Sequence, residues 1–102
     1  MYESLKEWVN VPFKILPFTG RSGAGTKQFS APVDSLCYPK EDVKLVVDDG
    51  GAEVVSTTQL YVDGTVDIKV TDDVIFEGTQ KPIKRVGSFY RNGEVDIKVV
   101  YL

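Results

Sequence analysis

Turn-forming dipeptides divide this chain into short runs, and this feature limits its possible folds most strongly. Asp49-Gly50, Asp63-Gly64 and Asn92-Gly93 suit the two-residue turns of β-hairpins, because Asn, Asp and Gly adopt positive φ at little cost. The run 94–102 alternates between two sets of side chains, with the period of a strand that has one face in a core. The pattern therefore predicts a mainly β chain of antiparallel strands.

About six or seven short strands are expected between the turns. They cover 12–18, 29–38, 43–48, 53–62, 73–77, 81–90 and 94–102. Pro12 and Pro17 lie at the margins of the first, which favours an edge position because proline cannot donate to a strand ladder. A polar break at 39–42 separates the second strand from the third. Strands at intervals of about ten residues are typical of a small β-barrel or a sandwich, and closure favours the barrel because it removes exposed edges.

The N-terminal segment has a different periodicity. Tyr2, Leu5 and Trp8 recur at helical spacing, which predicts a short amphipathic helix within residues 1–10. Pro12 prevents a longer one. This segment caps the core, or it forms an arm that packs on a neighbouring subunit.

The segment 19–28 is a polar loop that carries Gly20, Gly23 and Gly25. Three glycines in six residues predict a flexible glycine-rich hairpin. The spacing of Gly20 and Gly25 matches part of a phosphate-binding P-loop, but Thr26-Lys27 reverses the required Lys-Ser/Thr order. The loop also joins two expected strands and opens no helix, so we expect no nucleotide site.

One five-residue string occurs twice. Val-Asp-Ile-Lys-Val covers both 66–70 and 95–99. A structural repeat would also conserve its turns and spacing, whereas the flanks here diverge. We interpret the two copies as shared strand-like composition, with duplication the alternative.

Composition excludes several classes of function. The 102 residues indicate a single domain, 1–102. One cysteine, Cys37, and no histidine exclude an internal disulfide and most zinc or haem sites. We expect Cys37 to be a small buried hydrophobe, since no histidine can activate it. No apolar run is long enough to cross a membrane, so we expect no membrane association.

The acidic residues do not form a recognisable catalytic or metal-binding pattern. Most of them lie at turns, where Asp bonds the local backbone, and the spacing of an EF-hand is absent. We therefore expect no enzyme, no catalytic residues, no metal and no cofactor. The net charge of −3 argues against ordinary nucleic-acid binding, which needs a basic surface.

Several segments in order carry a family resemblance. They are 11–13, 18–20, 29–33, 49–62, 68–78, 83–86 and 99–102. Together they resemble the head-closure (stopper) proteins of long-tailed bacteriophages, small head–tail connector proteins that are often labelled minor capsid proteins. The resemblance covers the chain from about residue 9 onward, and its motifs are short and structural.

The resemblance implies a β-barrel that forms a homo-oligomeric ring in the virion neck, of about twelve copies, by a heterologous interface that closes. It also implies a portal adaptor protein and a tail terminator or tail completion protein as partners. Packaged double-stranded DNA would pass through the lumen without sequence-specific binding, and the acidic charge suits that passage. Synthesis would take place in the host cytoplasm. Alternatives are a tail terminator or other neck or tail ring protein, or a small β-barrel module that binds oligonucleotide or carbohydrate.

Three segments are then the candidate functional regions. The candidate channel-lining loop contains Asp48, Asp49, Gly50 and Gly51. The candidate inter-subunit or adaptor loop contains Gly20, Arg21, Gly23, Gly25 and Lys27. The candidate N-terminal arm contains Tyr2, Leu5 and Trp8.

Overall fold

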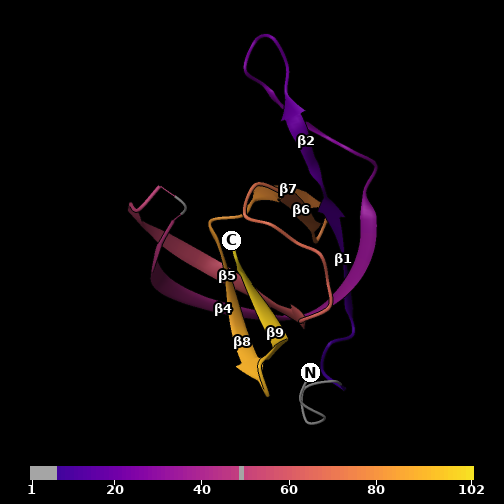
Figure 1. Ribbon diagram of the computed structural model, residues 1–102, viewed down its shortest axis with the longest axis vertical. Coiled ribbons are helices and arrows are strands. Elements are labelled where there is room, and N and C mark those ends of the chain that lie inside the picture. The colour runs from indigo at the N-terminus through magenta and orange to yellow at the C-terminus, as the bar shows by residue number, and fades with distance from the viewer. Residues whose placement is uncertain (1–6, 49) are drawn as a thin grey trace.

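A computed structural model describes residues 7–48 and 50–102 of the chain, which form nine strands and no helix (Figure 1). The strands are β1 (Val11–Leu16), β2 (Phe18–Arg21), β3 (Lys27–Phe29), β4 (Val33–Val47), β5 (Glu53–Asp63), β6 (Asp73–Phe76), β7 (Thr79–Pro82), β8 (Arg85–Arg91) and β9 (Glu94–Tyr101). The prediction of a mainly β, antiparallel chain is confirmed.

Seven strands form one sheet in the order β7-β6-β1-β4-β5-β9-β8, and β2 and β3 form a separate hairpin. All paired strands are antiparallel. The long strands β4 and β5 form the middle of the sheet and also extend beyond it. In Figure 1 their far ends project to the left, while the β2–β3 hairpin projects at the top.

The sheet curls around the core without closing, so the prediction of a closed barrel is wrong. Within the described residues β7 and β8 are the two edges of the sheet and do not pair. Two causes keep them apart. Pro82, at the end of β7, has no N–H to donate, and the residues Ile83 and Lys84 that join the edges lead the chain away, with the Lys84 N–H bonded to Tyr101 O at 2.8 Å.

The prediction of an N-terminal helix is not supported where it can be checked. Residues 7–10 form a turn, in which Asn10 N–H donates to Trp8 O at 3.0 Å. Tyr2 and Leu5, which supplied the helical spacing, lie outside the described residues. One turn that leads directly into β1 leaves no room for a helix to continue past Trp8.

Several strand predictions need correction: the described residues form nine strands and not six or seven, and the expected strand 81–90 is divided by Ile83 and Lys84 into β7 and β8. The segment 12–18 was expected at an edge, whereas β1 lies between β6 and β4. Pro12 is tolerated there because β6 pairs only with residues 14–16, so β1 has a single neighbour at Pro12. Residues 39–42, expected to separate two strands, instead belong to the continuous strand β4, which has a β-bulge between Glu41 and Lys44.

The core occupies the concave side of the sheet. Its buried residues are Phe13, Ile15, Cys37, Leu60, Val62, Ile68, Val74, Phe76, Ile83, Val100 and Leu102. They come from β1, β4, β5, β6, β9 and the connections, with alternate residues of each strand pointing inward. The opposite, outer face of β4 and β5 points away from this core.

Candidate assembly surfaces

The most distinctive surface feature is the projecting end of the β4–β5 hairpin, here called the arm, residues 43–56. Beyond the bulge, Leu45 pairs with Val55 and Val47 with Glu53. Directly paired residues share a face of a sheet. The arm therefore carries Val43, Leu45, Val47 and Val55 on one side, here called the arm face.

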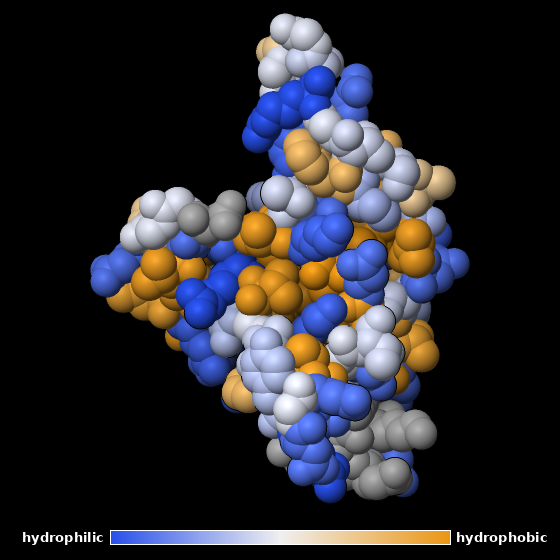
Figure 2. Space-filling view, in the orientation of Figure 1, coloured by the Kyte–Doolittle hydropathy of each residue, from blue (hydrophilic) through white to orange (hydrophobic). Residues whose placement is uncertain are grey.

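The arm face is apolar and uncovered. Val43 is 73% exposed, Leu45 65%, Val55 49% and Val47 45%. Figure 2 shows apolar surface gathered over this projection. Isolated exposed aliphatic residues are ordinary, but a contiguous group on a projecting element is typical of an interaction site.

The arm is held firmly at its base. Gln59 is fully buried, and its Nε2 donates to Asp42 O at 2.9 Å and to Ser56 Oγ at 3.1 Å. The bond to Asp42 O fixes the bulge, because it joins β5 to the backbone of the bulged strand β4, and the bond to Ser56 Oγ, within β5, holds the Gln59 amide in place. The arm is thus a positioned element rather than a loose loop.

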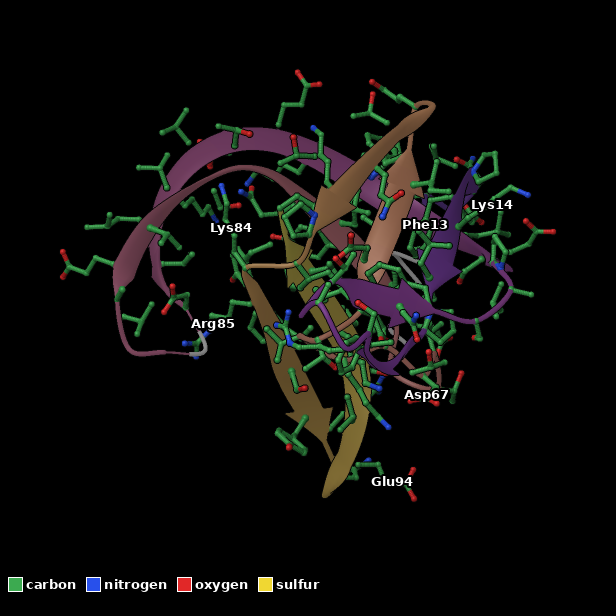
Figure 3. The ribbon with its side chains drawn as sticks, turned by 90° about the horizontal axis from the view of Figure 1, so that it is seen from above. Phe13, Lys14, Asp67, Lys84, Arg85 and Glu94 are labelled. Carbon is green, nitrogen blue, oxygen red and sulfur yellow. The ribbon has the colours of Figure 1, made fainter. Side chains whose placement is uncertain are left out.

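Two basic side chains support the inner, concave side of the arm (Figure 3). Lys84 Nζ donates to Val55 O, and Arg85 NH1 donates to Val47 O at 3.3 Å. Both bonds are made to backbone oxygens. The inner side is therefore tied to the body of the protein, which leaves the arm face as the free one.

The tip of the arm contains the candidate channel-lining loop. Asp48 Oδ1 accepts hydrogen bonds from Gly50 N at 3.0 Å and from Ala52 N at 2.9 Å. Gly51 has φ 83°, a conformation that favours glycine. Asp49 lies outside the described residues. Asp48 thus shapes the turn, and its role in lining a channel stays a prediction.

The candidate adaptor loop is a hairpin between β2 and β3, which confirms that part of the prediction. Gly20 and Arg21 belong to β2, Lys27 belongs to β3, and Gly23 and Gly25 lie in the turn. Gly25 has φ 84°, and Arg21 NH1 donates to its carbonyl at 3.0 Å. The flexibility of this hairpin stays a prediction.

Lys27 is engaged within the protein rather than offered to a partner. Its Nζ lies 3.2 Å from Asp73 Oδ1 and 5.5 and 5.2 Å from the ring centroids of Phe18 and Phe29. A cation over two aromatic faces beside a carboxylate stabilises the base of the hairpin. We therefore assign Lys27 a structural role.

A second apolar surface lies on the outer face of β1 and β4. Leu36 pairs with Pro12, so both point away from the core that contains Cys37. Trp8 packs against Tyr38, with ring centroids 6.2 Å apart. Leu36 is 50% exposed and Trp8 60%. We call the residues Trp8, Pro12, Leu36 and Tyr38 the body patch.

The three candidate regions do not converge on one site. The glycine hairpin lies at the top of Figure 1, the arm at the left and the described segment that leads into β1 near the bottom. The arm face was not among the predicted functional regions, although Val43, Leu45 and Val47 alternate with other residues in the sequence. The bulge reverses which residues point outward, and no local signal reports that shift.

The described residues show no assembled reactive centre. Cys37 is fully buried, and burial raises the pKa of its thiol to about 12, so it is an inert core residue. Within residues 7–48 and 50–102 no group of three or more His, Cys, Asp or Glu side chains could hold a metal ion. No helix in this part of the chain is long and apolar enough to cross a membrane.

One cavity of about 470 Å³ lies beside the start of β2 and β4. Asp72 lies on its wall but is already engaged. It accepts hydrogen bonds from Phe18 N and from Lys69 N, both at 2.9 Å. The cavity is therefore partly lined by groups that hold the fold together.

No protein-family model and no curated protein matches this chain.

Proposed function

We propose that the chain is a structural protein of the neck of a long-tailed bacteriophage, where copies of it form a ring that closes the DNA-filled head and offers a docking surface to the tail. The observation that carries the proposal is the arm face, a positioned apolar surface that none of the described residues covers. The resemblance of the sequence to head-closure proteins is the reason for proposing the virion neck as the place where this surface acts.

The energetics of the arm face favour assembly on a template. Fully burying one Val or Leu side chain contributes about 1.5–3 kcal/mol, so covering the exposed parts of the four residues contributes roughly 4–7 kcal/mol. Association itself costs about 4–15 kcal/mol. Free copies are therefore expected to associate weakly, whereas copies held side by side on a portal assembly gain a high effective concentration.

The test uses DNA-filled heads that lack tails, from the phage that encodes the chain. The purified protein is expected to bind these heads and to stop leakage of the genome, measured as nuclease-sensitive DNA. It is expected not to bind free DNA. Binding without any gain in genome retention would contradict head closure and would favour another neck or tail ring protein.

A matched pair of variants separates assembly from folding. Val43 on the arm face and Val33 at the start of β4 are both exposed valines, 73% and 51%. Val43→Ser is expected to weaken head binding about tenfold, since about 1.4 kcal/mol per interface corresponds to that factor. Val33→Ser, away from the arm face, is expected to leave binding unchanged. Equal losses of head-binding affinity in both variants would contradict the proposed role of the arm.

A small-molecule or oligonucleotide binding module is the second candidate, and the cavity beside β2 and β4 is what favours it. Such a module would be a monomer whose melting temperature rises with ligand. A melting shift with a sugar or an oligonucleotide, together with no binding to heads, would replace the neck proposal.

A further inference from the structure

The arm face and the body patch both include residues of β4, and these residues lie on the same side of the strand. In β4 Leu36 points away from the core, and across the bulge Leu45 does so as well, because Glu41 and Lys44 pair with the inward residues Thr58 and Ser56. Leu36 and Leu45 are nine residues apart, which is about 30 Å along a strand. A continuous strand cannot fold onto itself, so within one molecule these two surfaces never meet.

We infer that the arm face of one copy docks on the body patch of the next copy, which makes a head-to-tail interface. This inference rests on the proposed ring and names the contact that builds it. Because the two surfaces are different, a pair of docked copies keeps one free arm face, on one copy, and one free body patch, on the other. Such a heterologous contact propagates, and it closes into a ring when the rotation between copies allows.

The two surfaces are suited to each other in chemistry. The arm face is aliphatic and narrow, and the body patch combines Leu36 with the rings of Trp8 and Tyr38, the kind of aromatic anchor that is enriched in interfaces. Glu53 lies on the arm face opposite Val47. Lys40 lies beside the body patch, two residues after Tyr38 and exposed. Docking therefore brings a carboxylate toward an ammonium group at the rim, which favours this pairing over arm-to-arm contact.

Crosslinking between variants that each carry one added cysteine tests the pairing. Leu45→Cys labels the arm face, Leu36→Cys labels the body patch, and Gly23→Cys at the tip of the glycine hairpin is the control. Native Cys37 is fully buried, so we expect it not to react with a short bismaleimide reagent. The variants are mixed in pairs, in concentrated solution and on tailless DNA-filled heads, and the products are separated by mass.

The mixture of Leu45→Cys with Leu36→Cys is expected to give the crosslinked dimer at about ten times the yield of either variant alone. A chain with both substitutions is expected to give a ladder of multimers that ends at the closed ring. Dimers from Leu45→Cys alone in excess would overturn the inference in favour of a symmetric arm-to-arm contact. Products equal to those of the Gly23→Cys control would overturn it as well.

The outcomes distinguish this inference from the neck proposal. A ladder in solution without any binding to heads supports the interface and contradicts the neck role. Binding to heads with genome retention, but without the mixed crosslink there, supports the neck role and overturns the interface.

Discussion

Gly64 is the glycine at which a single methyl group should disturb the fold most. An ideal Cβ at this position would lie 2.1 Å from Val95 O and 2.9 Å from the carbonyl carbon of Asp96. Real Cβ atoms essentially never come closer than 3.0 Å to other heavy atoms, so the strand must move by about 0.9 Å. The Gly64 N–H also donates to Asp96 O at 3.0 Å, and that bond would be strained by the same movement.

The expected cost of Gly64→Ala combines these two effects. Overpacking against a fixed backbone costs about 1–3 kcal/mol, and a weakened hydrogen bond costs about 1 kcal/mol. We therefore expect a loss of about 3 kcal/mol, which corresponds to a fall in melting temperature of roughly 12–24 °C for a domain of this size. Urea and thermal unfolding followed by circular dichroism measure both quantities.

Gly23→Ala is the matched control for this prediction. A Cβ at Gly23 meets nothing within 4 Å, and Gly23 has no positive φ, unlike the neighbouring Gly25. Its stability is expected to stay within about 0.5 kcal/mol of the parent protein. If Gly64→Ala were equally harmless, the close approach of the 63–66 turn to β9 would be refuted.

The remaining predictions concern the core. Leu60 is fully buried, so Leu60→Ala is expected to lower the free energy of unfolding by about 2–5 kcal/mol in urea titrations. Asp72→Ala removes the acceptor for the amides of Phe18 and Lys69, with an expected loss of about 2–3 kcal/mol; an unchanged midpoint would contradict this. The thiol of Cys37 is expected to resist thiol reagents in the native protein at pH 8 and to react in urea. Because burial raises its pKa from 9.0 to about 12, its contribution to stability is present below pH 9 and is lost as the pH rises toward 12, so the parent should lose more stability over that range than Cys37→Val.

Turn chemistry and strand periodicity allowed much of the secondary structure to be predicted. The turn at Asn92-Gly93 joins β8 to β9, and the alternation after it becomes β9. Asp63-Gly64 ends β5. These signals are local, since they depend on backbone preferences of the residues themselves.

Whether a strand-like segment forms a strand depends on its tertiary contacts, which local sequence signals do not report. The string Val-Asp-Ile-Lys-Val is strand in β9 at 95–99 but lies outside any strand at 66–70. The copy at 95–99 has neighbouring strands to pair with, whereas the copy at 66–70 crosses from β5 to β6 and places Ile68 in the core. Strand preference therefore expresses itself only where a partner strand is available.

The candidate site was predictable only in part. The turn at the tip of the arm and the glycine hairpin of β2 and β3 could be predicted from their sequences, and both project from the rest of the protein (Figure 1). The exposure of the arm face did not follow, because Val43, Leu45 and Val47 have the composition of a core strand. Their exposure depends on how far β4 and β5 extend past the other strands, which is a property of the whole sheet.

The proposed assembly of this chain into a closed ring on a DNA-filled head can be tested directly. The most direct measurement is the mass of protein bound per tailless head, determined for the parent and for Val43→Ser. For the parent we expect a single saturating mass that corresponds to a closed ring of about twelve copies, and for the variant a much reduced occupancy at the same concentration. A parent protein that leaves the mass of the heads unchanged, or that adds mass without saturating, would contradict the account.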